Sequence, residues 1–278
     1  RASGPTPLDN LFRFTVKIFK DAKGRRLSSL ECHDLMCKVG EVVVSGGVRR
    51  SAMISLSNLS DQRMRHAKSG QWWETAPQMA LSNNSVCYTD KPDGETFLRE
   101  WTALVESKSG ERGIFNRISA KEQAKKFGRR NADYEFGTNP CSEIILRPYQ
   151  FCNLTEVVIR EKDKFEDLKR KVMLATILGT AQATLTKFPY LRKVWKTNTE
   201  EERLLGVSLT GIMDNELTSG KKHGLDKTLE ALRQVAVETN KEWATIFSIP
   251  QSTAITCVKP SGTVSQLVDS SSGIHPRH

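Results

Sequence analysis

The sequence lacks any long apolar run. No stretch approaches the roughly 18 consecutive apolar residues that a membrane-spanning helix requires, which excludes an integral membrane protein. It also lacks a secretory segment, because residues 1–5 contain neither an initiator Met nor an apolar start. We therefore expect a cytoplasmic protein with no membrane partner. Both ends look cut, and we expect a fragment of a longer chain.

Cysteine pairs of the kind that bind zinc are absent. The six cysteines form no C-x-x-C pair, and no His lies at zinc spacing beside them. Their scatter in a chain of 278 residues is not a disulfide framework, so most are expected to be buried thiols. His275 and His278 are expected to be surface residues rather than metal ligands, and we predict no metal site. The cysteines are Cys32, Cys37, Cys87, Cys141, Cys152 and Cys257.

Nucleic-acid signatures are also missing, since no RNP-like aromatic run or basic heptad occurs. The formal charge is nevertheless +10. Two interpretations remain open: a basic face that attracts phosphorylated small molecules, or Lys and Arg that solvate helix faces, as in residues 121–130. We expect no direct nucleic-acid binding.

Segments with the apolar spacing of a helix alternate along the chain with segments that have the pattern of a strand, which indicates an α/β protein. Helices are predicted for 8–19, 30–44, 97–105 and a segment opened by Ser119 with Glu122 in a capping box, and strands for 51–57, 113–116, 151–159 and 253–258. A later helix is predicted from one apolar face. No linker divides the chain, so we predict a single domain over 1–278. The face comprises Leu229, Leu232, Ala236, Thr239, Trp243 and Ile246.

The segment GTNPCSEI at 137–144 carries the most chemistry. Gly137 and Pro140 exclude a regular helix or a paired strand. An amide, a thiol and a carboxylate follow at a spacing of two, which in an extended loop points all three to one side. Such a set fits catalysis, although a turn with a buried thiol and an exposed carboxylate explains the spacing equally well. The three residues are Asn139, Cys141 and Glu143.

Taken with FCNLTEVV at 151–158, the run NPCSEI closely resembles the active-site segment of ribonucleotide reductases. The interval of eleven positions between Cys141 and Cys152 is similar to that of the adenosylcobalamin-dependent class II enzymes. Three further stretches agree in content and order: GGVRRSA at 46–52, GERGIFNR at 110–117 and VKPSGTVS at 258–265. The resemblance spans nearly the whole chain.

This resemblance implies a role for each matching residue. Cys141 would become the thiyl radical, Glu143 the general base and Asn139 the hydrogen-bond partner of the ribose hydroxyls. Cys152 would supply one reducing equivalent, with a disulfide partner expected upstream of Arg1. The substrate phosphate would lie against Pro260, Ser261, Gly262 and Thr263, where a simple turn is the alternative from the residues alone. The specificity loop would be Gly46, Gly47, Val48, Arg49 and Arg50.

The resemblance also implies a fold and a reaction. The fold would be a ten-stranded α/β barrel with a central finger loop, here incomplete on its N-terminal side. The reaction would reduce ribonucleoside di- or triphosphates to deoxyribonucleotides, with adenosylcobalamin as cofactor. Expected partners are the ribonucleotide substrate, a dNTP or ATP effector, a thioredoxin- or glutaredoxin-type reductant and a second copy in a homodimer. The alternatives are a class I large subunit, which receives its radical from a metal-bearing partner, and a non-catalytic nucleotide-binding relative.

Overall fold

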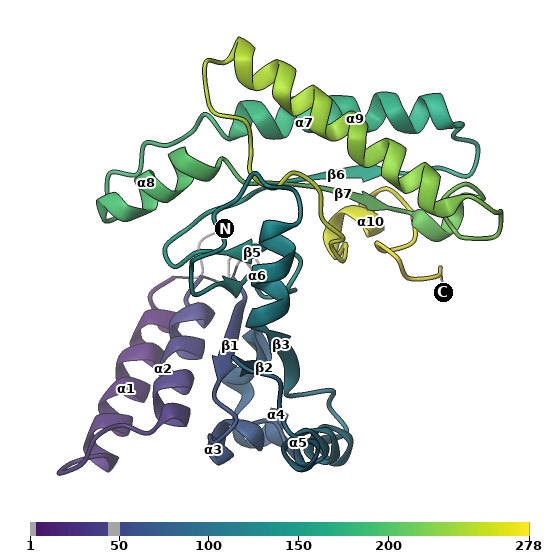
Figure 1. The fold of residues 1–278 in the computed structure, drawn as a ribbon. Coiled ribbons are helices and arrows are strands. Elements are labelled where there is room, and N and C mark those ends of the chain that lie inside the picture. The colour runs from purple at the N-terminus through teal and green to yellow at the C-terminus, as the bar shows by residue number, and fades with distance from the viewer. Residues whose placement is uncertain (1–3, 44–50, 278) are drawn as a thin grey trace. The chain divides into compact units, whose positions relative to one another are not determined.

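The computed structural model describes residues 4–43 and 51–277 of a mixed α/β protein (Figure 1). Contacts divide the chain into two compact units. Unit 1 comprises Arg1–Ala120 and Gly137–Cys141, and unit 2 comprises Lys121–Phe136 and Ser142–His278. The single domain expected over 1–278 stays a prediction. Across the described residues, no helix is both long and apolar enough to cross a membrane.

Unit 1 contains a parallel sheet in the order β1-β2-β3. Residue pairs such as Ser55 with Asn84 and Ser85 with Gly113 set its register. The predicted strands at 51–57 and 113–116 are confirmed, whereas the central strand, β2, was not predicted. The elements are α1 (Thr6–Asp21), α2 (Ser29–Glu41), β1 (Met53–Ser57), α3 (Gln62–Arg65), α4 (Trp72–Thr75), η1 (Pro77–Leu81), β2 (Ser82–Tyr88), α5 (Gly94–Ser107), β3 (Gly113–Asn116), α6 (Arg117–Lys125, which continues into unit 2) and β4 (Gly137–Thr138).

The predicted helices of unit 1 are present, with one error at a helix start. The α2 helix begins at a capping box, in which the Ser28 hydroxyl accepts from the Glu31 N–H and the Glu31 carboxylate accepts from the Ser28 N–H. The capping box predicted at Ser119 is wrong, because Ser119 lies inside α6. The cap is Asn116, whose side-chain oxygen accepts from the N–H groups of Ile118 and Ser119 at 2.9 and 3.1 Å.

The segment 110–117 is anchored by a buried ion cluster. Arg112 donates to Glu100 at 2.8 Å, and Arg65 also pairs with Glu100. The preceding Glu111 accepts from the Asn84 N–H at 2.5 Å and pairs with Lys68 at 3.0 Å. These bonds fix β3 against β2, which gives the segment a structural role in unit 1.

Unit 2 is built on two parallel strands, β6 and β7, paired so that Leu154 faces Gly206. Residues 254–257 run along the other edge of β7: the Val207 N–H donates to Ile255 at 2.8 Å, and the Cys257 N–H donates to Val207 at 3.1 Å. The strand predicted for 253–258 is therefore wrong as a regular strand, because only Thr256 forms a bridge. The elements are β5 (Ile145–Leu146), β6 (Asn153–Val158), α7 (Phe165–Gln182), α8 (Lys193–Glu202), β7 (Leu205–Thr210), η2 (Ile212–Asp214), α9 (Leu225–Ile246) and α10 (Thr263–Leu267).

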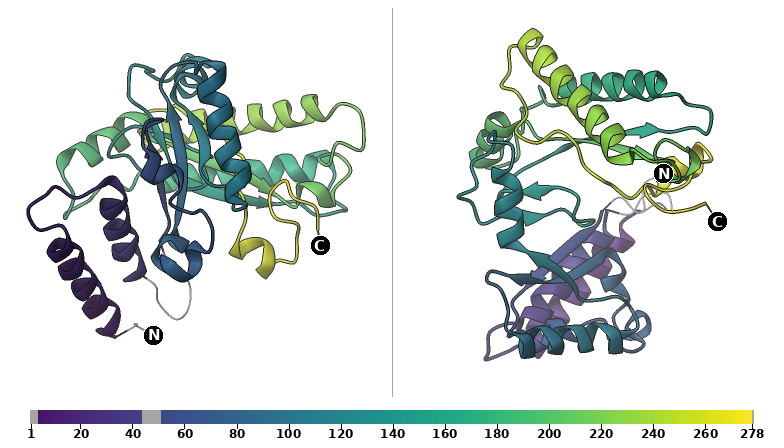
Figure 2. Two further views of the ribbon diagram at one scale, coloured as in Figure 1. Left: turned by 90° about the horizontal axis from the view of Figure 1, so that it is seen from below. Right: turned by 45° about the vertical axis from the view of Figure 1, so that its right-hand side comes forward.

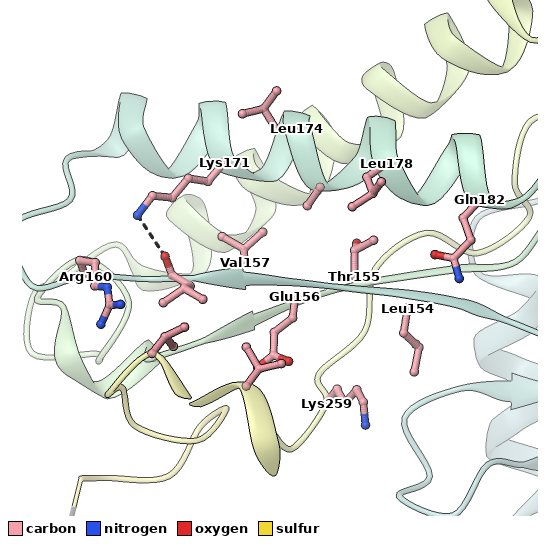
Figure 3. A pocket seen from close by; sticks show the side chains of 14 residues that line it. Leu154, Thr155, Glu156, Val157, Arg160, Lys171, Leu174, Leu178, Gln182 and Lys259 are labelled. Carbon is pink, nitrogen blue, oxygen red and sulfur yellow. Dashed lines mark hydrogen bonds between the residues drawn. The ribbon is translucent and has the colours of Figure 1, made fainter. Parts of the chain in front are cut away.

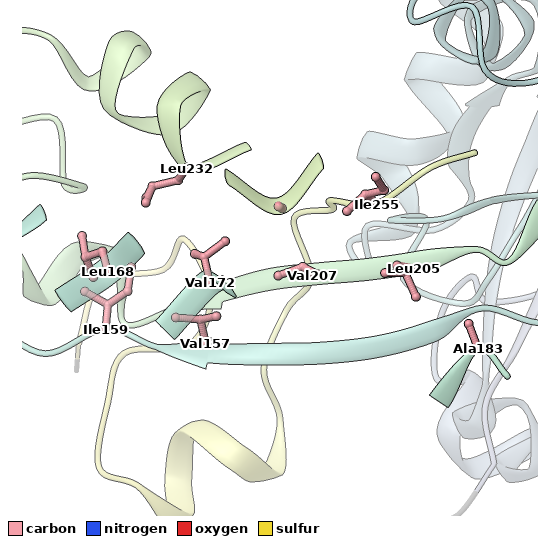
Figure 4. Packing of buried hydrophobic residues seen from close by; sticks show 10 residues of the cluster. Val157, Ile159, Leu168, Val172, Ala183, Leu205, Val207, Leu232 and Ile255 are labelled. Atoms are coloured by element: carbon pink, nitrogen blue, oxygen red, sulfur yellow. The ribbon is translucent and has the colours of Figure 1, made fainter. Parts of the chain in front are cut away.

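The α7 and α9 helices lie side by side over one face of β6 and β7 (Figures 1 and 2). Apolar side chains from both helices and both strands form a buried cluster there (Figure 4). The predicted apolar face of α9 is partly wrong, since Leu229 and Ile246 are exposed. The buried stripe instead continues through Asn240 and Ala244, as the period of 3.6 residues requires. The cluster contains Val157, Ile159, Leu168, Val172, Ala183, Leu205, Val207, Leu232, Ala236 and Ile255.

A second buried ion cluster joins α8 to the rest of unit 2. Glu202, whose side chain is 1% exposed, accepts from Arg130 at 2.8 Å and from Gln150 at 2.5 Å, and lies 3.1 Å from Arg147. Glu202→Ala would leave two arginines buried without their carboxylate, so we expect a loss of about 3–5 kcal/mol in the free energy of unfolding. Urea denaturation measures it.

Glu201→Ala is the matched control, because Glu201 also pairs with Arg147, at 2.7 Å, but is 53% exposed. An exposed pair contributes less than about 1 kcal/mol. Equal losses for the two variants would contradict the structural role given to Glu202.

Candidate functional site

The loop at 137–143 begins in unit 1, which holds Asn139 and Cys141, and continues in unit 2, which holds Glu143. Within unit 1, the Asn83 side chain on β2 donates to the Pro140 carbonyl at 2.6 Å and fixes the loop. The Cys141 thiol is exposed. The extended geometry expected here is wrong at Ser142, which has a φ of 62° in the left-handed region. The spacing of two therefore does not by itself place the three side chains on one side.

Glu143 is the buried carboxylate of unit 2. Its side chain is 0% exposed, and in the described part of the chain neither oxygen has a hydrogen-bond partner. Lys259 lies nearest among its charged neighbours, with the ammonium 3.5 Å from one carboxylate oxygen. Buried carboxylates are normally satisfied by hydrogen bonds. An unsatisfied one beside a lysine has open acceptor positions for a ligand hydroxyl, which is what a general base needs.

Cys152 and Cys257 lie close enough to Glu143 for its negative charge to raise the pKa of each thiol. Burial raises the pKa of Cys152 to about 11, and the Glu143 carboxylate raises it further while Lys259 opposes it. Burial likewise raises the pKa of Cys257 to about 12, with contributions from Glu143 and Cys152. Both groups are therefore protonated thiols at neutral pH, able to deliver hydrogen rather than act as thiolate nucleophiles.

The strand order separates these two thiols. Cys152 immediately precedes β6 and Cys257 lies in the segment on the far side of β7, so two strand spacings, roughly 9–10 Å, separate their backbones. A disulfide requires Cα atoms within about 7 Å. Cys257 is therefore not placed to be the disulfide partner of Cys152, and a partner upstream of Arg1 stays a prediction.

Gly206 on β7 leaves space for the side chains of the neighbouring segments. A Cβ atom there would lie 2.4 Å from Leu154 Cδ2, 2.9 Å from Ile144 Cδ1 and 3.1 Å from Cys257 Sγ. Side chains from both flanking segments thus meet over the middle strand, and Ile144 is the neighbour of Glu143 in the chain. A side chain at position 206 would push into the site.

We expect Gly206→Ala to reduce the free energy of unfolding by about 1–3 kcal/mol, because the added methyl overpacks a closed region. Thermal or urea unfolding measures the change. Gly179→Ala on α7 is the matched control, since its Cβ would meet Thr155 and Leu205 only at 3.4 Å or more. A loss at Gly179 equal to that at Gly206 would contradict the tight approach over β7.

The predicted phosphate loop at 260–263 lies between residue 259 and α10. The buried Ser261 hydroxyl accepts from the Ser265 N–H at 3.0 Å, and the Ser261 N–H donates to Ser272 at 3.0 Å, so this serine holds the turn together. Pro260, Gly262 and Thr263 are exposed, and a Cβ on Gly262 would meet nothing within 4 Å. The backbone near Gly262 is thus open to an anion, whereas Ser261 is engaged in the fold.

A cavity of about 810 Å³ opens beside β6, with Lys259 and Val264 in its wall. Figure 3 shows Leu154, Glu156 and Lys259 on the side of β6 away from α7, with Thr155 and Val157 on the α7 side. Lys259 and Glu156 therefore lie on the sheet face opposite α7, whereas Glu143 lines a separate cavity of about 490 Å³ with residues of α9 such as Arg233 and Val237.

The remaining predicted residues lie outside unit 2. The specificity loop at Gly46, Gly47, Val48, Arg49 and Arg50 lies outside the described residues. Cys37 is buried beside His33, with its pKa raised to about 11 by burial, as expected of a structural thiol. Cys32 is exposed on α2.

Sequence reasoning missed Lys259 and Cys257 as members of the site. Cys257 and Lys259 stand two positions apart, on either side of Val258, and this spacing is a signal that could have placed them on one face.

Comparison with known proteins gives a consistent result. No family model matches the chain. The adenosylcobalamin-dependent ribonucleoside-triphosphate reductase of Lactobacillus gasseri is 30% identical over 309 residues, covering 99% of this chain and 40% of the relative. The enzyme of the same name from Lactobacillus leichmannii is 29% identical over 307 residues, with the same coverage. The chain thus spans about two fifths of the length of the curated relatives that it matches.

Solved structures agree. A B12-dependent class II ribonucleotide reductase superposes with a TM-score of 0.74 at 25% identity, covering 99% of this chain and 40% of that one. The class Id ribonucleotide reductase alpha subunit of Actinobacillus ureae gives a TM-score of 0.59 at 14% identity over 97% of this chain and 60% of that one, which is a likeness of fold. The resemblance inferred from the four motifs is confirmed, and over nearly its whole length the chain is homologous to part of the adenosylcobalamin-dependent (class II) ribonucleotide reductases.

Proposed function

We propose that this chain carries the reaction centre of an adenosylcobalamin-dependent ribonucleotide reductase, which reduces ribonucleoside triphosphates to deoxyribonucleotides for DNA synthesis. The observation that carries the proposal is Glu143, a fully buried carboxylate with open acceptor positions, placed beside the protonated thiol of Cys152. The choice of triphosphates follows the names of the relatives.

The residues divide the reaction among them. A thiyl at Cys141 takes the hydrogen atom from ribose C3′, since S–H and C–H bonds are similar in strength. Glu143 accepts the 3′-hydroxyl proton, and Asn139 holds the ribose hydroxyls in register. Cys152 protonates the departing 2′-hydroxyl, which leaves as water.

The thiol partner of Cys152 then gives its hydrogen to C2′, and the two sulfurs join in a disulfide, which supplies the two electrons. Cys141 returns its hydrogen atom to C3′, and Glu143 returns the proton to the 3′-oxygen. This sequence needs Cys152 to be a protonated thiol at the start, in agreement with its raised pKa. A thioredoxin- or glutaredoxin-type protein would reduce the disulfide afterwards.

The exposure of Cys141 fits an external radical source. Adenosylcobalamin, when bound, supplies the chemistry that removes the hydrogen atom from a thiol. Of the residues in this chain, Cys141 would face that cofactor. A class I enzyme would need a metal-bearing partner in its place.

We further propose the family's ten-stranded barrel, in which the parallel strands of units 1 and 2 would be parts of the wall and the loop at 137–143 the central finger. Residues 260–263 would hold the substrate phosphates through the backbone near Gly262. Residues 46–50 would relay the identity of a dNTP or ATP effector. A homodimer and a cytoplasmic location are part of the same proposal.

The proposal is tested by incubating the full-length protein with adenosylcobalamin, a dithiol reductant and a ribonucleoside triphosphate or diphosphate, without any metal-bearing partner. We expect deoxyribonucleotide formation from the triphosphate. Reduction only after a metal-bearing subunit is added would assign the protein to class I. Nucleotide binding without reduction under either condition would indicate the non-catalytic relative.

A further inference from the structure

Lys259 is held at the candidate site by its own backbone. Its N–H donates to the hydroxyl of Ser208, a buried residue of β7, at 3.0 Å. From this anchor the side chain runs along the sheet face away from α7 (Figure 3), and its ammonium lies 3.5 Å from the Glu143 carboxylate. The side chain is 31% exposed and lines the open cavity beside β6.

The carboxylate needs this cation. Burial of a carboxylate without a compensating charge or hydrogen bond is strongly unfavourable. Among the described residues, Lys259 is the one cation within 4 Å of Glu143. The ammonium of Lys259 therefore bears directly on how this carboxylate is held.

The charged and titratable groups around Glu143 form one electrostatic set. Cys152 comes from the start of β6, and Cys257 and Lys259 come from the segment beside β7. Glu156 lies on the same side of β6 as Lys259. Glu143 also lines a cavity of about 490 Å³ with the charged residues Lys126, Arg129, Arg130, Glu230 and Arg233. Glu143 raises the pKa of both thiols, and Lys259 lowers it. The lysine therefore opposes the effect of Glu143 on each thiol.

We propose that Lys259 is a positioning residue of the reductase reaction, whose ammonium holds the Glu143 carboxylate in place for proton transfer. The inference rests on the proposed function and adds to it a residue outside the predicted phosphate loop. A direct phosphate contact is the competing role, because Pro260 follows at once.

The first test compares Lys259→Met with Lys259→Arg in the full-length protein. Methionine keeps much of the length and loses the charge, so kcat should fall about tenfold or more while KM changes little, because a misplaced base is a loss in the reacting complex rather than in binding. Arginine should restore most of kcat. Lys171→Met is the matched control, because Lys171 pairs with Asp163 and the Val158 carbonyl on the α7 side.

A raised KM with unchanged kcat would assign Lys259 to phosphate binding and overturn the proposal. A loss of kcat that arginine does not relieve would also overturn it, as a merely structural effect. Unfolding midpoints of all variants exclude global destabilisation, and Lys259→Gln replaces the methionine variant if that one fails to fold.

The second test does not depend on turnover. The rate of Cys152 alkylation by iodoacetamide at fixed pH, resolved by peptide mass spectrometry, follows the thiolate fraction. Lys259→Met should slow it and Glu143→Gln should speed it, each by several-fold. If the two variants change the alkylation rate in opposite directions but the protein shows no reductase activity, the Lys259–Glu143 pair is supported and the proposed function is rejected. If neither variant changes the rate, the pair is overturned whatever the activity.

Discussion

Replacing Cys141 with alanine is expected to abolish ribonucleotide reduction, lowering kcat by at least about 10⁴-fold, because no other group in the loop can carry the thiyl. Serine should fail equally. Its O–H bond is much stronger than the ribose C–H bond, so the hydrogen atom would not be returned to C3′. Substrate binding should persist in both variants, since the predicted phosphate loop at 260–263 lies elsewhere in the chain. Single-turnover deoxyribonucleotide formation and equilibrium nucleotide binding measure the two properties separately.

Cys32→Ala is the matched control, because Cys32 is another exposed thiol of unit 1. It should reduce ribonucleotides at the wild-type rate. Turnover retained in Cys141→Ala would reject the radical assignment, and turnover retained in Cys141→Ser alone would indicate a polar role for the side chain.

Local patterns predicted much of the fold. Helices α1, α2, α5 and α9 follow apolar periodicity, and β1, β3 and β6 follow short apolar runs flanked by turn residues. The strands β2 and β7 were missed because SNNSVCY and LGVSLT carry polar residues or glycine where a strand is usually apolar. Their place in the middle of parallel pairing depends on neighbours far along the chain, which periodicity does not report.

The residues of the candidate site were likewise predicted only in part. Motif resemblance identified Glu143 and Cys152, and the structure describes the two close to each other in unit 2. Lys259 and Cys257 were missed, because their relation to Glu143 comes from the register of residues 254–257 along β7. The bend at Ser142 was also unforeseen, since a left-handed conformation is uncommon for serine and no glycine marks it.

Glu143→Gln is expected to lower kcat by about 10²–10⁴-fold with little change in substrate affinity. The substitution keeps the shape of the side chain and removes the acceptor charge, so the 3′-hydroxyl proton has no base to receive it. It also leaves the Lys259 ammonium without its charged partner. The rate at saturating substrate and the binding constant together separate a lost base from a lost contact.

Glu156→Gln is the sharpest control, since Glu156 is a second carboxylate on the same face, with one oxygen also buried and without a hydrogen-bond partner in the described chain. If the reaction depends on the carboxylate beside Lys259 and Cys152, the Glu156 variant should keep most of its turnover. The reverse result, with loss at Glu156 and retention at Glu143, would move the base to β6. It would also remove the reason for the Lys259 pair, because the residue at 143 would then be a buried ion pair without a part in proton transfer.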